Sequence, residues 1–122
     1  MTRNDKRNLQ ARKASAPSRI QAARLDALIE EAIVDAYTEA EQAVGFHATI
    51  EQHLALPFET VVLGAPVTAK RVDVTAEGGL VVICYRGRER QAIPILELPL
   101  PNPPPAGWEW IEAYRQWARG RS

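Results

Sequence analysis

Apolar residues recur at helical spacing from about residue 19 to residue 54 of this chain. The members of this stripe are Leu25, Leu28, Ile29, Ala32, Ile33, Ala36, Tyr37, Ala40 and Val44. Such a period predicts one long amphipathic helix. Gly45 is its weak point, where we expect the helix to bend or divide. The helix should end before Pro57, because the residue that precedes a proline is pushed out of the helical region.

Beyond Pro57 the period of the pattern changes from that of a helix to that of strands. Gly78-Gly79 indicates a hairpin, and Pro94 should place the last strand at a sheet edge or at a bulge. Four short strands are predicted, at residues 58–63, 70–75, 80–85 and 91–98. The third of these is continuously apolar, which is typical of a strand buried on both faces.

The C-terminal part combines a stiff connector with a second helix. Residues 99–105 hold five prolines, which favour an extended connector. Aromatic residues at helical spacing then predict a helix over residues 106–119. The fold class predicted is α+β, with a long N-terminal helix, a small four-stranded antiparallel SH3-like sheet or barrel, and a C-terminal helix.

Length and composition predict one small domain with a polar arm. The chain has 122 residues, which suits a single domain at 19–120. Residues 1–18 are basic and lack aromatic residues, so we expect a disordered arm. The arm has no apolar segment that would mark a secretory signal. A single cysteine, Cys84, excludes an intramolecular disulfide, and together these features predict a cytoplasmic protein.

Charge is segregated along the chain although the total is balanced, with 15 basic and 15 acidic residues. Residues 25–59 contain no Lys or Arg and eight acids: Asp26, Glu30, Glu31, Asp35, Glu39, Glu41, Glu51 and Glu59. On one helix Glu31, Asp35 and Glu39 would form a row. Such a row suits a hard cation such as Ca²⁺, with further oxygen ligands from loops. On periodicity alone, however, a solvated face or ion pairs with Arg86, Arg88 and Arg90 are favoured over a metal site.

Other motifs give little sign of catalysis. His47 and His53 are six residues apart, which is a poor spacing for a metal pair on a helix, and one of them should pack at the helix–sheet junction. Cys84 lies in an apolar run, as a small buried hydrophobe would. No nucleotide-binding loop, catalytic triad pattern or EF-hand loop is present in the sequence. We therefore expect a protein that is not an enzyme and does not enter a membrane.

Residues 33–41, Ile-Val-Asp-Ala-Tyr-Thr-Glu-Ala-Glu, belong to a longer string that resembles a known family. The string continues with Val44-Gly45-Phe46 and Leu56-Pro57-Phe58, and the resemblance extends to the closing aromatic helix. It resembles the CcbP-type calcium-binding proteins, which bind Ca²⁺ without EF-hands. The resemblance implies that Ca²⁺ is bound by carboxylates of the helix and of facing loops. Carried over by position, the implied ligands are Asp35, Glu39, Glu41 and Glu51.

This chain departs from the resemblance in its basic residues. The family is acidic throughout, whereas here the strands and the last helix carry Arg86, Arg88, Arg90, Arg115 and Arg119. Arginines close to the carboxylates would weaken a calcium site, which depends on ligand charge. The leading hypothesis is a calcium buffer or sensor. The alternative is a metal-independent interaction module that docks a basic protein partner or, less favoured, nucleic acid.

Overall fold

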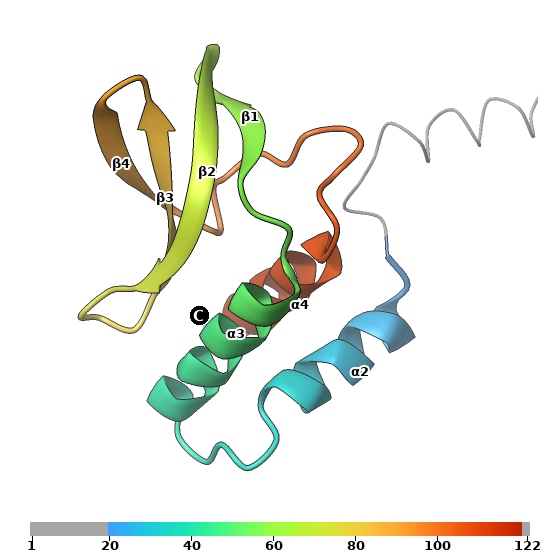
Figure 1. Ribbon diagram of the computed structural model, residues 1–122. Helices are drawn as coiled ribbons and strands as arrows, with labels where there is room; N and C mark the ends of the chain where they lie inside the picture. The colour runs from blue at the N-terminus through green and yellow to red at the C-terminus, as the bar shows by residue number, and fades with distance from the viewer. Residues whose placement is uncertain (1–19, 121–122) are drawn as a thin grey trace, which may run out of the picture.

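The structure, a computed structural model, describes residues 20–120. The arm predicted at residues 1–18 lies outside the described residues. Within these described residues, three helices and four strands follow one another: α2 (Ala22–Ala32), α3 (Glu39–His53), β1 (Phe58–Val62), β2 (Ala65–Val74), β3 (Leu80–Arg86), β4 (Glu89–Pro94) and α4 (Trp108–Arg119). The α+β class is confirmed, and the helices lie together on one side of the sheet (Figure 1).

The predicted single long helix is wrong, because the chain divides into α2 and α3 at residues 33–38. The division does not fall at Gly45, which lies inside α3. Thr38 caps α3, and its hydroxyl accepts a hydrogen bond from the Glu41 amide while the Glu41 carboxylate accepts one from the Thr38 amide. This capping box is a helix-start signal. Thr38 and Glu41 have the spacing of this motif in the sequence, but the continuous helical period predicted no helix start there.

The break also changes which face of the second helix is buried. A helical period counted across six non-helical residues loses its phase, so the stripe is correct only in α2, where Leu28 and Ala32 are buried. Tyr37 and Val44, predicted as core, are 86% and 56% exposed. The buried residues of α3 are Ala43, Phe46 and Ile50.

The four predicted strands are confirmed, with shifted ends. They form an antiparallel sheet in the order β1-β2-β3-β4, and β2 is longer than predicted, with a bulge between Ala69 and Arg71. Strand β3 is buried from Leu80 to Cys84, as its apolar run indicated. Pro94 ends β4 at an edge of the sheet. The SH3-like character of the sheet stays a prediction.

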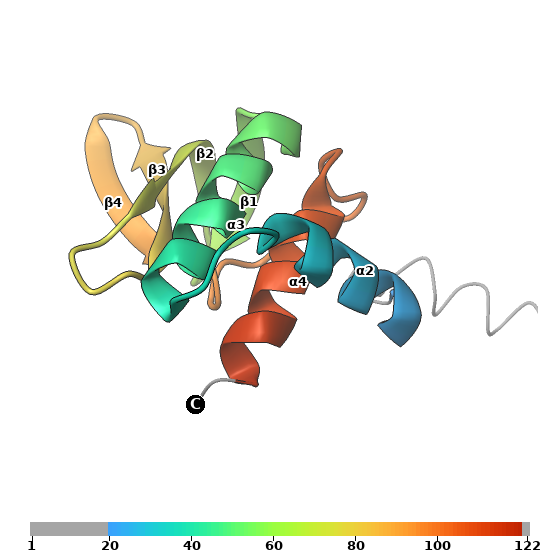
Figure 2. The same cartoon turned by 90° about the horizontal axis from the view of Figure 1, so that it is seen from below.

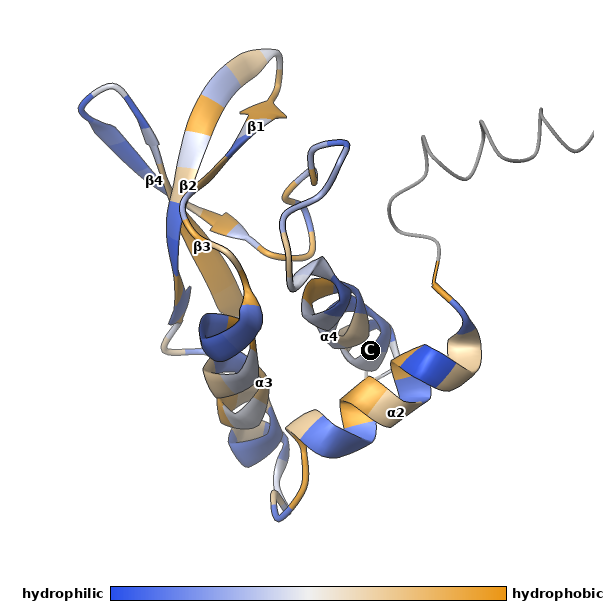
Figure 3. Cartoon of the chain, turned by 45° about the vertical axis from the view of Figure 1, so that its right-hand side comes forward, coloured by the Kyte–Doolittle hydropathy of each residue, from blue (hydrophilic) through white to orange (hydrophobic). Residues whose placement is uncertain are grey.

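The hydrophobic core lies between the sheet and the helix pair α3 and α4. Phe46, Ile50 and Ile111 are fully buried there, beside Val82 of the sheet. Helix α2 packs against α4 and α3 on the side away from the sheet (Figure 2). Colouring by hydropathy shows the polar β3–β4 hairpin projecting beyond this core (Figure 3).

Arg115 joins α4 to the segment that follows the sheet. Its Nε and Nη2 atoms donate to the Ile95 carbonyl at 3.0 and 2.9 Å, and Nη2 also donates to the Leu98 carbonyl. Its Nη1 atom donates to the Glu112 carboxylate at 2.8 Å, and both side chains are largely buried. One guanidinium therefore satisfies a buried acid and two loop carbonyls at once.

Gly45 is required by close packing between helices. A Cβ atom at this position would lie 2.4 Å from the Ala32 carbonyl oxygen at the end of α2. The absence of a side chain thus lets the two helices approach each other next to the break.

We predict that Arg115→Met lowers the free energy of unfolding by about 3–5 kcal/mol, because Glu112 would be left buried without its cation. Arg88→Met, on the exposed β3–β4 turn, should change it by no more than about 0.5 kcal/mol. Urea denaturation measures both. Equal stability of the two variants would contradict the role given to Arg115.

We predict that Gly45→Ala destabilises the protein, although alanine in a helix interior is normally favoured over glycine by about 1 kcal/mol. The added methyl would push the Ala32 carbonyl away and open the α2–α3 contact. Thermal unfolding gives the sign directly. A raised melting temperature would show that the two helices are not held by this close approach.

Candidate metal centre

The acidic residues at the start of α3 are arranged around the loop of residues 33–38. Asp35 lies at the exposed turn of this loop in the left-handed region, with φ of 63°, a conformation that Asp adopts more readily than most residues. Glu39 is the first residue of α3 and is exposed. Asp35 thus comes from a loop and Glu39 from a helix, so the row predicted from Glu31 through Asp35 to Glu39 does not exist.

Two side chains of α3 hold this loop in place. The Glu41 Oε1 atom accepts hydrogen bonds from the Tyr37 and Thr38 amides at 2.8 and 3.0 Å. The Gln42 Nε2 atom donates to the Ala36 carbonyl at 3.4 Å, and its Oε1 atom accepts from the Trp117 indole at 3.0 Å. The loop is therefore tied both to its own helix and, through Gln42, to α4.

Glu41 has a structural role, because its carboxylate holds the loop that precedes α3. Hydrogen bonds from the backbone amides of Tyr37 and Thr38 hold the pKa of its carboxyl below the usual value. Its Oε1 atom is already an acceptor of two hydrogen bonds, which leaves Oε2 as the better-placed oxygen for any ion. Of the four residues that the resemblance implied, Glu41 therefore acts first as a cap.

Glu51 lies apart from the other three acids. Twelve residues separate it from Glu39 on the same helix, which at 1.5 Å per residue is about 18 Å along the axis. A calcium ion holds its ligands at roughly 2.3–2.6 Å, so these two carboxylates cannot share one ion. The neighbour of Glu51 is His47, at 3.9 Å between Oε2 and Nε2.

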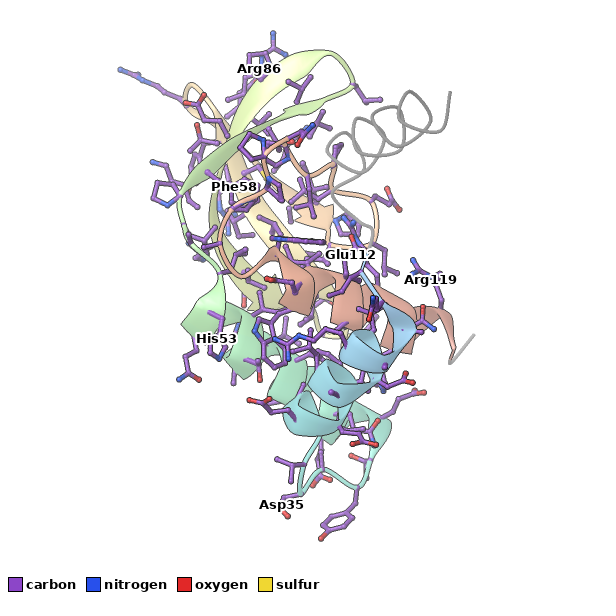
Figure 4. The ribbon with its side chains drawn as sticks, turned by 90° about the vertical axis from the view of Figure 1, so that its right-hand side faces the viewer. Asp35, His53, Phe58, Arg86, Glu112 and Arg119 are labelled. Carbon is purple, nitrogen blue, oxygen red and sulfur yellow. The ribbon has the colours of Figure 1, made fainter. Side chains whose placement is uncertain are left out.

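Of the five arginines that could weaken a calcium site, four lie in the β3–β4 hairpin or are paired with another residue, and the fifth, Arg119, is the last residue of α4. Arg86 stands at the end of the molecule opposite to Asp35, as the labelled side chains show (Figure 4). Arg88 and Arg90 belong to the same exposed β3–β4 hairpin. Arg115 is engaged with Glu112, so neither residue faces the loop as a competitor or as a further ligand. The alternative in which the hairpin arginines pair with the acidic row is thus wrong.

A groove next to the loop brings in an acid that the sequence analysis missed. It is a cavity of about 590 Å³ between the start of α3, the β2–β3 hairpin and the end of α4. Glu39 and Glu77 both line it, together with Gly78 and Trp117. The hairpin and the start of α3 lie side by side in both ribbon views (Figures 1 and 2). Only the tertiary fold brings Glu77 here, 38 positions after Glu39.

The acidic residues at this end of the molecule have the oxygen ligands that calcium prefers, but they do not form a complete coordination site. Asp35, Glu39 and Glu77 offer only oxygen, the ligand that calcium prefers. Within residues 20–120, however, no three side chains of His, Cys, Asp or Glu are gathered closely enough to hold a metal ion. An ion at this end would need backbone carbonyls and water in addition to one or two carboxylates.

The other chemically versatile side chains are structural. The His47 Nε2 atom lies 3.0 Å from the Val72 carbonyl of β2, which confirms a histidine at the helix–sheet junction, and His53 stacks on Trp110. Cys84 is a buried free thiol, and burial raises its pKa, which disfavours the reactive thiolate. None of the helices described is long and apolar enough to cross a bilayer.

Comparison with protein families identifies the chain. Residues 26–118 match the model of the CcbP-type family, described as calcium binding. The match covers most of the chain, so this protein belongs to that calcium-binding family, and Ca²⁺ is the ion with which the family is associated. Comparisons with curated proteins and with solved structures found no significant match.

We predict that Thr38→Ala lowers the free energy of unfolding by about 1 kcal/mol through loss of the cap, whereas Thr38→Ser keeps it within a few tenths. Urea denaturation at neutral pH measures the difference. A Thr38→Ala protein as stable as the Thr38→Ser protein would show that the cap does not hold the loop.

A pH dependence follows from Glu41. Because the folded state depresses its pKa, the ionised carboxyl stabilises the fold above the unfolded value of about 4.3. That stabilisation is lost as the pH falls through the folded pKa. The stability difference between the natural chain and Glu41→Gln should therefore shrink between about pH 5 and pH 3. A difference that stays constant over this range would contradict the prediction.

Proposed function

We propose that this protein binds Ca²⁺ with modest affinity at the end formed by the 33–38 loop and the start of α3, and that it acts as a buffer or sensor rather than as an enzyme. Asp35 and Glu39 are the carboxylates we assign to the ion, with loop carbonyls and water as further ligands. Glu41 supports the loop that presents them. Cytoplasmic localisation belongs to the same proposal and is consistent with the single buried cysteine.

The observation that carries the proposal is the separation of charge in space. Asp35 and the hairpin that bears Arg86 lie at opposite ends of the molecule (Figure 4). The guanidinium of Arg115 is occupied by Glu112 and two carbonyls. The hairpin arginines and Arg115 therefore do not oppose the charges of Asp35 and Glu39.

Few protein ligands imply a weak and partly hydrated site. Calcium takes six to eight oxygens, and sites with a low ligand charge bind with a Kd on the order of 10⁻⁴–10⁻³ M. Since Asp35 and Glu39 are exposed, their attraction for the ion is screened by salt. The affinity should therefore fall as ionic strength rises.

The second candidate function is metal-independent docking of a basic partner. It is favoured by the groove in which Glu39 and Glu77 line one cavity beside Trp117. Two carboxylates and an aromatic ring suit a lysine or arginine side chain, through charge and cation–π attraction.

Calorimetric titration with CaCl₂ tests the calcium proposal. We expect heat with a Kd on the order of 10⁻⁴–10⁻³ M for the natural chain, and a loss of affinity of about tenfold for Asp35→Asn, because one ligand charge is removed. Glu51→Gln makes the same change in charge on α3 away from the loop and should leave the affinity nearly unchanged. Absence of heat at millimolar calcium, or an equal loss in both variants, would overturn the assignment to this end of the molecule.

A further inference from the structure

Large apolar side chains that stay exposed are grouped in two places within residues 20–120. One group lies in or just after the 33–38 loop, and the other lies at the end of β1 and its turn into β2. The first consists of Val34, Tyr37 and Val44, and the second of Val61 and Leu63. Exposed apolar side chains that cluster, rather than scatter singly, mark interaction surfaces.

Leu63 is unfavourable for the fold itself. Its side chain is 102% exposed, and its backbone lies in the left-handed region with φ of 51°. With Gly64 it forms the two-residue turn between β1 and β2, in which a positive φ at both positions favours Asn or Asp at the first. A leucine here has a strained backbone and buries no apolar surface, so folding does not account for it.

The β3–β4 hairpin places positive charge beside this leucine. Leu63 and Arg86 line one hollow of about 180 Å³, together with the buried Val67 and Cys84. Residues 86–91 carry three arginines and one glutamate, a formal charge of +2, and all three arginines are exposed. This end of the sheet therefore suits a ligand that combines an apolar side chain with a carboxylate.

The opposite end of the same molecule offers that combination. In the 33–38 loop, Val34 and Tyr37 are 67% and 86% exposed, and the exposed Asp35 lies between them in sequence. Residues 33–44 carry three acids and no Lys or Arg. Because Asp35 and Arg86 lie at opposite ends of the molecule (Figure 4), these two surfaces can meet only between different copies.

We propose that two copies of this chain associate head to tail, with the 33–38 loop of one docked at the hairpin end of the other. The exposed apolar side chains of the loop would contact Leu63, and Asp35 would face Arg86. Since the two surfaces differ, the contact is heterologous, and every assembly keeps one free surface of each kind. A contact limited to one loop and two turns is small, and small contacts are typical of weak, transient association.

Sedimentation equilibrium of the full chain tests this association in calcium-free buffer with a chelator. We expect the weight-average mass of the natural chain to rise with concentration and to exceed that of a dimer at about 1 mM, for a Kd of about 1 mM or less. A closed dimer cannot give this result, whereas a head-to-tail contact continues to add copies.

Two double variants each disable one surface. Leu63→Asn/Arg86→Gln removes the hairpin end, and its melting temperature should not fall, because Asn suits the left-handed turn position. Asp35→Asn/Tyr37→Ser removes the loop end. Each variant alone should stay monomeric, and an equimolar mixture should form dimers and nothing larger, because the mixture retains one surface of each kind on different chains.

Leu96→Asn is the matched control, because Leu96 is an exposed leucine in the segment between β4 and α4 and belongs to neither surface. It should associate as the natural chain does. A natural chain that stays monomeric at about 1 mM, association by either double variant alone, or a mixture without dimers would overturn the proposal. Since calcium is excluded, a failure here is distinct from a failure of the calcium titration.

Discussion

The fold depends most directly on one buried guanidinium. Arg115 lies on α4, and its donors reach the Ile95 and Leu98 carbonyls of the segment that leaves the sheet, as well as the Glu112 carboxylate. Helix α4 in turn packs against both α2 and α3. Without this contact the Glu112 carboxylate and the Ile95 and Leu98 carbonyls would lose their shared donor, and the segment that leaves the sheet would lose its link to α4.

A short chain of hydrogen bonds fixes the acidic loop of residues 33–38 to α4. The Trp117 indole of α4 donates a hydrogen bond to the Gln42 side chain, which in turn donates one to the Ala36 carbonyl. The Glu41 carboxylate accepts hydrogen bonds from two backbone amides of the same loop. Phe46 packs edge-on against Tyr114 beneath this network. The candidate calcium ligands are thus exposed, but the backbone that bears them is anchored to the core.

The separation of the two charged ends gives the molecule its functional character. In a chain of zero net charge, the acids could all pair with arginines, and no negative potential would then remain to attract a cation. Here Arg86, Arg88 and Arg90 lie in the β3–β4 hairpin and Arg115 is paired with Glu112, so these four arginines do not neutralise the acidic loop. The calcium site that we propose draws on this arrangement.

The amino-acid sequence by itself determined the α+β class, the four strands and the family, because strand alternation, turn glycines and the Asp35–Glu41 string are local signals. The sequence also contains the signal for the start of α3, because Thr38 and Glu41 have the spacing of a capping box. The continuous helical period obscured this signal. The phase of α3, the burial of Phe46 and the exposure of Tyr37 were decided only when the chain broke at residues 33–38. The placing of Glu77 and Glu39 in one groove and the hydrogen bonds of Arg115 join distant segments of the chain, which no local pattern encodes.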